Sequence, residues 1–300
     1  MGKVTLQIQS VIYKNEVTSL YKAMEGIDAA IANCRNRGIE IEAVLHYGDA
    51  SPEPIIKDAD IQRINQKYTY IQFKYSYFAC NTGTAKGHNN LAYGCSTDYM
   101  MIMNPDIIME AACIYELLMM LENEEVGMVE ARQTPLELAK VYDIKTFETE
   151  WVSTACTVFK TEIFHKLKGF DYETFFMYCD DLDFSWRLRL EGYQIKYNPN
   201  AIIYHSKKLS NIGQWRPTSA EVYYSAEAAI LMAYKWSNDK RVEKLLAQYD
   251  SVGGEDEQRA ANEFRKRKRE RRLPLQLDKE HKIAKFIGDN YSLMRFSYNK

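Results

Sequence analysis

Three aspartates fall within four residues of the stretch FFMYCDDLDFSWRLR, at Asp180, Asp181 and Asp183. Aromatic and apolar residues surround them in the sequence, and burying a carboxylate among such residues costs free energy. The cluster is also unusual for a plain solvated helix. Asp183 and Arg187 stand four residues apart and can pair on a helix, and the helix dipole favours ionised Asp180 and Asp181 in the first turn. An ionised carboxylate in an apolar-walled cleft is a candidate general base. The same residues could instead form only an acidic N-terminal cap.

A second candidate site follows the apolar stretch 99–103, where the chain reads Asn104-Pro105-Asp106. We expect a buried strand there to bring the Asp106 carboxylate to the edge of a sheet, where it can hold a divalent cation that in turn holds a diphosphate. His205 ends another apolar stretch and could complete this metal site. On these residues alone, Asp106 could equally cap the next helix, and His205 could be an ordinary satisfied polar residue.

The stretch NTGTAKGHNN, residues 81–90, combines asparagines with two glycines, Gly83 and Gly87. Glycines allow close backbone approach, and the helix that they open presents an N-terminus suited to a phosphate or to sugar hydroxyls. The stretch has neither the GK[ST] of a Walker loop nor the GxGxxG of a dinucleotide fingerprint. A simple helix start is the alternative for this motif.

These candidate residues follow segments that alternate between strand and helix patterns. Strands are predicted at about 4–13, 39–46, 68–73, 99–103, 126–130, 154–159, 194–197 and 201–204. Helices are predicted at about 18–37, 85–94 and 111–123, in the later part of 175–191, and at 222–248. This alternation predicts an α/β fold with a mostly parallel, twisted sheet flanked by helices on both faces. Ligands of such sheets bind beyond the carboxyl ends of the strands, where YGDAS and NPD fall.

The composition of the chain excludes several classes of protein. Its 300 residues allow one large domain or two small ones. With 39 Lys and Arg against 41 Asp and Glu, the net charge of −2 argues against a whole-chain binder of nucleic acid. No apolar run is long enough to span a membrane, and the start MGKVTLQIQS has no apolar signal core, so we expect a cytoplasmic protein. The six scattered cysteines are expected to be reduced thiols.

Near residue 215 the sequence changes from alternating strand and helix patterns to long helical patterns. This change predicts a domain at 1–215 and a C-terminal helical extension at 216–300. Within the extension, the stretch FRKRKRERRL at 264–273 holds seven basic residues and one acidic residue. It could dock on an anionic membrane surface, at the inner face of the cell membrane, with Phe264 and nearby leucines inserting. It could equally be a solvated helix face or pack against a second subunit. The predicted helix at 222–248 is long enough to support a homodimer.

The order of the motifs is more specific than any one of them. The chain carries, in turn, YKN at 13–15, GDAS at 48–51, NTGTAKGHNN, NPD, GFD at 169–171, the acidic block, GY at 192–193 and a strand ending at His205. This series resembles the family 2 glycosyltransferases, and within them the bacterial rhamnosyltransferase-like group, over about residues 3–206. The chain departs from the family pattern at two places. Asp180 stands where the family usually has glutamate, and Gly48-Asp49-Ala50-Ser51 replaces the usual Asp-x-Gly-Ser of the nucleotide loop.

The resemblance implies a GT-A, Rossmann-like fold and an inverting transfer from a nucleotide-diphospho-sugar donor, with Mg²⁺ or Mn²⁺ as the cofactor. It assigns the general base to Asp181, with Asp180 as the next candidate, and the metal site to Asp106 with His205. The donor-binding residues that it implies are Tyr13, Asn15, Asp49, Asn81, Gly83, Asn89, Asn104 and Asp106. The residues that would orient the acceptor or the sugar hydroxyls are Tyr178, Asp183 and Arg187.

By the same resemblance, dTDP-rhamnose is the first choice of donor, with UDP-hexoses as the alternative, and the acceptor is a growing surface polysaccharide or a lipid-linked glycan. Two other functions compete with transfer. A non-catalytic module that binds sugar nucleotides or glycans predicts loss of the base or the metal carboxylate, but both positions are occupied. A nucleotidyltransferase would want a glycine- and lysine-rich loop after the first strand, where SVIYKNEVTS has no glycine.

Overall fold

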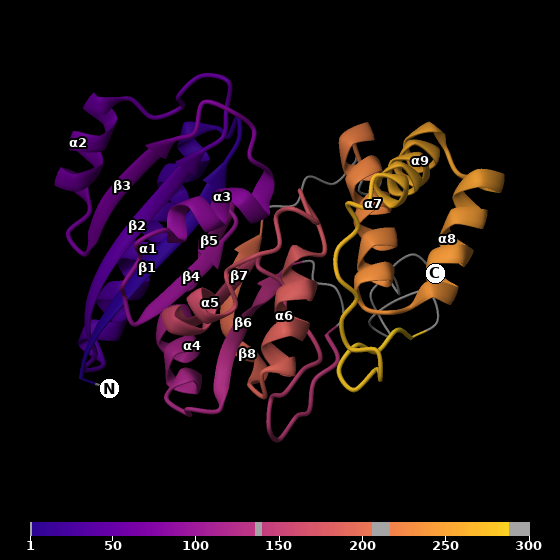
Figure 1. Ribbon diagram of the computed structural model, residues 1–300. Helices are drawn as coiled ribbons and strands as arrows, with labels where there is room; N and C mark the ends of the chain where they lie inside the picture. The colour runs from indigo at the N-terminus through magenta and orange to yellow at the C-terminus, as the bar shows by residue number, and fades with distance from the viewer. Residues whose placement is uncertain (1, 136–139, 206–216, 288–300) are drawn as a thin grey trace.

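The computed structural model describes residues 2–135, 140–205 and 217–287 (Figure 1). The strands are β1 (Lys3–Ile12), β2 (Glu40–Asp49), β3 (Ile71–Tyr77), β4 (Tyr99–Met103), β5 (Ile107–Met109), β6 (Val126–Thr134), β7 (Cys156–Lys160) and β8 (Gln194–His205). The helices are α1 (Val17–Asn36), α2 (Asp58–Lys67), α3 (Gly83–Ala92), α4 (Cys113–Leu121), α5 (Thr161–Lys166), α6 (Asp180–Leu190), α7 (Ser219–Lys235), α8 (Asp239–Val252) and α9 (Glu255–Arg269). Within these residues the strands form one sheet in the order β3-β2-β1-β4-β7-β6-β8-β5.

The predicted α/β class is confirmed, with a more mixed sheet than the alternation of elements predicts. Strands β3, β2, β1 and β4 run parallel, as βαβ connections require. Strand β7 then runs antiparallel to both β4 and β6, β8 is parallel to β6, and β5 is antiparallel to β8. As a result, the C-terminal ends of β4 and β8, at Met103 and His205, lie at the same edge of the sheet.

Helices cover both faces of the sheet because the central strands are apolar on both sides. In β4, Met101 and Met103 pack in the core under α1 and α4. Met100 and Ile102 point the other way, into the core shared with α3, α5 and α6. A strand buried on both faces has an unbroken apolar sequence, which YMMIM shows.

Several predicted elements need correction. The helix predicted at 222–248 is two helices, α7 and α8, separated at Ser237, whose φ of 59° is outside the helical range. The single long helix is therefore wrong as a basis for a homodimer, and the homodimer itself stays a prediction. The strands predicted at 194–197 and 201–204 are one strand, β8, with an irregular register beside Ala131 and Arg132. The elements β5 and α5, of 3 and 6 residues, are too short to show a period in the sequence, and α2 was also not predicted.

The C-terminal helices α7, α8 and α9 form one bundle that shares an apolar core with α6 (Figure 1). Their core takes in Trp186 of α6, whose ring centre lies 5.1 Å from that of Trp236. Phe264 is only 3% exposed in this core, so the expectation that it inserts into a membrane is wrong. The predicted domain boundary near 215 lies outside the described residues. Within the described chain, none of the helices has the length and apolar character needed to cross a membrane.

Candidate active site

The first part of the candidate site is the edge of the sheet where β1 and β2 end. The backbone N–H of Ala50 donates to the Ile12 carbonyl at 2.9 Å, and that of Lys14 donates to the Ser51 hydroxyl at 2.8 Å. Asn15 accepts the backbone N–H of Tyr13 through Oδ1 at 2.8 Å. The two loops that follow parallel strands are thus joined, and they leave the Tyr13 ring 44% exposed at this edge.

Asp49 lies beneath these loops and is fully buried. Its Oδ1 accepts the backbone N–H of Ser51 at 2.8 Å, and its Oδ2 accepts the N–H of Ile55 at 2.7 Å and the hydroxyl of Tyr75. Both carboxylate oxygens therefore bind the protein itself. In this structure Asp49 shapes the loop after β2 from within.

The motif at 81–90 opens α3 against the segment that carries the acidic cluster. Asn81 Oδ1 accepts the backbone N–H of Gly83 at 3.1 Å. Gly83 has a φ of +67°, and a Cβ there would lie 2.3 Å from the Phe176 carbonyl oxygen. The Thr84 N–H donates to that same oxygen at 3.2 Å. Glycine is needed at this position both for its backbone angle and for the close approach of the two segments.

Asn89, on the next turns of α3, contacts the GFD turn. Its side-chain amide donates to the Phe170 carbonyl at 2.8 Å, and its Oδ1 accepts the Phe170 N–H at 2.9 Å. A Cβ on Gly169 would lie 2.4 Å from that Oδ1. Asn89 thus fastens α3 to the turn that leads into the acidic segment.

Asp106 and His205 meet where β4 ends, as the sequence predicted. His205 pairs with Ile107 across β8 and β5, and its Nε2 lies 3.5 Å from Asp106 Oδ1. The Gln133 amide oxygen lies 2.8 Å from the other ring nitrogen, Nδ1. A neutral imidazole whose Nδ1–H donates to this oxygen would leave Nε2 available to bind a cation.

This donor set fits a divalent cation. The imidazole and the carboxylate lie side by side, and Gln133 orients the imidazole through its other nitrogen, as partners do in metal sites. An imidazole and a carboxylate suit Mn²⁺ or Mg²⁺ together with phosphate oxygens. Asp106 is partly exposed, which leaves room for further ligands. Among the described residues, Asp106 and His205 are not joined by a third His, Cys, Asp or Glu in metal-binding geometry.

The acidic cluster begins with Asp180, which is only 5% exposed and accepts the Thr84 hydroxyl through Oδ2 at 2.9 Å. Burial, and then the charge of Asp181, raise the pKa of Asp180 to about 7. Asp181 is half-buried, and its Oδ1 accepts the N–H of Leu182 at 2.8 Å. The two carboxylates therefore release a proton near neutral pH, which suits a general base.

The backbone just before this pair is strained. Tyr178 and Cys179 have φ values of 68° and 58°, which place two consecutive non-glycine residues in the left-handed region. Burial, and then the nearby Glu221 carboxylate of α7, raise the pKa of Tyr178 to about 12. Such strain persists only where the surrounding structure holds it, and it sets the direction in which α6 starts.

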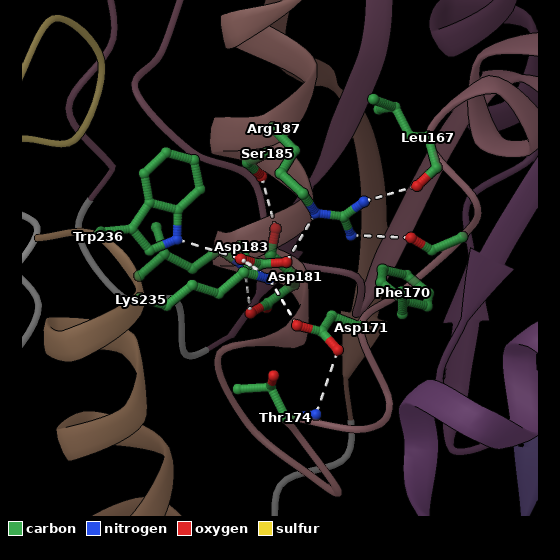
Figure 2. Close-up of polar contacts among 12 residues, drawn as sticks. Leu167, Phe170, Asp171, Thr174, Asp181, Asp183, Ser185, Arg187, Lys235 and Trp236 are labelled. Atoms are coloured by element: carbon green, nitrogen blue, oxygen red, sulfur yellow. Dashed lines mark hydrogen bonds and ion pairs between the residues drawn. The ribbon is translucent and has the colours of Figure 1, made fainter. Parts of the chain in front are cut away.

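Asp183 has a different environment from the other two aspartates (Figure 2). It is fully buried, and the predicted pairing with Arg187 is present at 2.8 Å. Its other oxygen, Oδ1, meets the Lys235 ammonium at 2.7 Å and accepts the Trp236 indole N–H at 3.1 Å. Arg187 also donates to the carbonyls of Leu167 and Gly169, both at 2.8 Å. Asp183 therefore joins α6 to α7 and to the turn before Asp171.

Four residues of this region were missed by the sequence analysis: Thr84, Gln133, Lys235 and Trp236. Thr84 belongs to the motif at 81–90, so its place beside a glycine was a usable signal. The other three carry no local signal, because each reaches its partner only through packing of distant elements.

No protein-family model and no curated protein matches the sequence. Among solved structures, the chain is similar to the mannosyltransferase PcManGT from Pyrobaculum calidifontis in complex with GDP-Man and Mn²⁺, with a TM-score of 0.56 and 14% identity over 87% of this chain and 78% of that one. It is also similar to S. aureus TarS 1-349, with a TM-score of 0.55 and 11% identity over 83% of this chain and 72% of that one.

A third similar structure is GalNAc-T7 with UDP, GalNAc and Mn²⁺, at a TM-score of 0.63 and 10% identity over 91% of this chain and 56% of that one. At these identities the likeness concerns the fold. The chain has the GT-A fold of glycosyltransferases, as the sequence resemblance implied.

Proposed function

We propose that this protein is a metal-dependent, inverting glycosyltransferase that uses a nucleotide-diphospho-sugar donor. The observation that carries the proposal is the pairing of His205 Nε2 with Asp106 Oδ1 at 3.5 Å, in a GT-A fold, at the strand end where such a fold binds ligands. Two of the similar structures support the metal and the type of donor, because they hold Mn²⁺ with a nucleotide sugar or a nucleotide.

The donor would lie along the edge formed by the loops after β1, β2 and β4. Tyr13, Asn15 and Asn104 border this edge, and Asp106 with His205 would hold the cation at its end. The cation would offset the negative charge of the leaving nucleoside diphosphate. The loops along this edge would be held in shape for the donor by the polar atoms and close contacts of four residues, Asp49, Asn81, Gly83 and Asn89.

The acid pair, Asp180 and Asp181, would take the proton of the acceptor hydroxyl. Asp181 is the better placed of the two to meet an acceptor, because it is half-buried whereas Asp180 is 5% exposed and bonded to Thr84. With Asp180 ionised, the pair is basic enough to accept a proton near neutral pH. One base on the face opposite the leaving group gives inversion, by the logic of single displacement.

In this proposal Tyr178 borders the acceptor, while Asp183 and Arg187 position α6 from inside. The donor sugar and the acceptor are proposed by class. Rhamnose from dTDP-rhamnose is the first choice and a UDP-hexose the second, and the acceptor is a hydroxyl of a surface polysaccharide or a lipid-linked glycan. The proposed place of action is the cytoplasm, at the membrane face if the acceptor is lipid-linked.

The test is a panel of sugar nucleotides, including dTDP-rhamnose, UDP-hexoses and GDP-mannose, assayed for release of nucleoside diphosphate with Mn²⁺, with Mg²⁺ and with excess chelator. We expect one donor to be used, and only with metal present. Asp106→Ala should lose the metal-dependent release. Asp250→Ala, which alters a half-exposed aspartate of α8 paired with Arg265, is the matched control. Binding of a donor without release under any condition would favour a non-catalytic module.

A further inference from the structure

The segment that carries the acid pair is fastened at both ends by one lysine of the C-terminal helices. Asp171 begins the segment and Asp183 ends it, and Asp180 and Asp181 lie between them. The Lys235 ammonium lies 2.7 Å from Asp171 Oδ2 and 2.7 Å from Asp183 Oδ1. Figure 2 shows the three side chains converging from the GFD turn, from α6 and from the end of α7.

The contact is buried, so solvent does not screen it. The Lys235 side chain is 6% exposed, Asp183 is 0% exposed and Asp171 is 24% exposed. Burial favours the protonated form of Asp171, but the charge and hydrogen bond of Lys235, together with the hydrogen bonds from Thr174, outweigh it and hold the pKa of Asp171 below its usual value. A buried lysine that pairs with two carboxylates fixes the positions of those two carboxylates relative to each other.

A second contact from α7 meets the same segment near its middle. The rings of Phe176 and Tyr224 stack with centroids 4.6 Å apart. Phe176 is also the residue whose carbonyl accepts the Thr84 N–H of α3. The left-handed residues Tyr178 and Cys179 follow after one intervening residue, so α7 and α3 both contact the chain just before the strained backbone.

We propose that Lys235 is a positioning residue for the acid pair, and that α7 thereby belongs to the catalytic machinery. The expected effect on catalysis rests on the proposed function, whereas the positioning of segment 171–183 by Lys235 does not depend on it. Lys235 acts through the two carboxylates that it contacts, those of Asp171 and Asp183. A displacement of the base by about 1 Å can reduce a rate about 100-fold, so a loosened segment affects turnover more than donor binding.

The test compares Lys235→Met with Lys235→Arg, which keeps the charge, and with Lys140→Met as the matched control. Lys140 is 5% exposed and pairs with the buried Glu130 at 2.6 Å, without contact to Asp171 or Asp183. Hydrogen–deuterium exchange over 171–183 reports on the segment, and kcat with the donor KM reports on chemistry. Thermal unfolding of each variant establishes that it is folded.

For Lys235→Met we expect faster exchange within 171–183, a fall in kcat of about 10–100-fold, and a donor KM within about threefold of the parent. Lys235→Arg should recover part of both losses, and Lys140→Met should show neither. Unchanged exchange over 171–183 in Lys235→Met, or an equal rise in Lys140→Met, would overturn the proposal. If Lys235→Met does not fold, Trp236→Phe, which removes one donor to Asp183, serves in its place with a smaller effect in the same direction.

Failure of the proposed function gives a different pattern. If the parent releases nucleoside diphosphate from none of the donors, while Lys235→Met still raises exchange over 171–183 and Lys140→Met does not, the positioning of the segment holds and transferase activity is rejected. If the parent is active but the kcat of Lys235→Met is parental, the activity holds and the positioning role is rejected.

Discussion

The hydroxyl of Thr84 offers a direct handle on the basicity of the acid pair. It donates to Asp180 Oδ2 at 2.9 Å, in surroundings where Asp180 is 5% exposed. Burial, and then the charge of Asp181, raise the pKa of Asp180 to about 7, and the Thr84 hydrogen bond opposes that rise because it favours the ionised form. Thr84→Val keeps the shape of the side chain and removes the donor.

The size of the effect follows from the strength of that hydrogen bond. A hydrogen bond to a charged group contributes about 1.5–3 kcal/mol, and one pKa unit corresponds to about 1.4 kcal/mol. The pKa of Asp180 should therefore rise by about one to two units in Thr84→Val. A base works in its ionised form, so the parent rate should increase with pH through about 7, and the variant should reach the same plateau about one to two units higher.

The assay is kcat measured from pH 5.5 to about pH 9.5 at saturating donor and metal. At pH 7, Thr84→Val should be slower than the parent by roughly fivefold or more, and at pH 9 the difference should shrink. Thr149→Val is the matched control, because the Thr149 hydroxyl is also buried but donates to the Val141 carbonyl at 2.9 Å. An acidic limb that stays at the parental pH in Thr84→Val would refute the assignment of Asp180 to the ionisation that limits the rate.

Three further results are expected. Asp181→Asn keeps its shape and loses basicity, so transfer should fall about 10²–10⁴-fold with donor binding intact by calorimetry; near-parental transfer would move the base to Asp180. Gln133→Leu removes the acceptor that orients His205, so Mn²⁺ affinity by calorimetry should fall about 10–100-fold, and unchanged affinity would contradict the metal site. Native Asp180 holds its proton more tightly than the unfolded chain does, so its contribution to stability is greatest below about pH 4 and is lost as the pH rises through about 7. Asp180→Asn should accordingly melt above the parent at pH 8 but not near pH 4, and equal melting at pH 8 would count against the raised pKa of Asp180.

The parts of this site that the sequence predicted are those set by local spacing or by strand ends. Asp183 and Arg187 pair because residues four apart share a helix face. Asp106 and His205 lie together because β4 and β8 deliver their ends to one side of the sheet. Both arrangements require only the period of an element and the rule that ligands collect at carboxyl ends of strands.

The parts that the sequence did not predict depend on packing between distant elements. Lys235 lies 52 residues after Asp183. The apolar pattern predicts one continuous helix there, but the helix ends before Ser237. The break there turns α8 back along α7 and places Lys235 and Trp236 at the end of a helix, facing α6. No periodicity of 3.6 or 2 residues contains that information, because the break depends on a single left-handed residue.

The C-terminal helices matter to the chemistry through the face of α6 that they cover. Cys179 and Leu182, which flank the acid pair, are buried in the same apolar core as Trp236 and Phe264. Burial is the largest cause of the raised pKa of Asp180, and the helices α7 and α9 cover the apolar side chains on either side of this residue. The basic stretch at 264–273 takes part as well, since Arg267 of α9 meets Glu227 of α7 at 2.9 Å and so holds the covering helices together. Burial makes a carboxylate more basic, and in this chain the helical extension packs against the helix that carries this carboxylate.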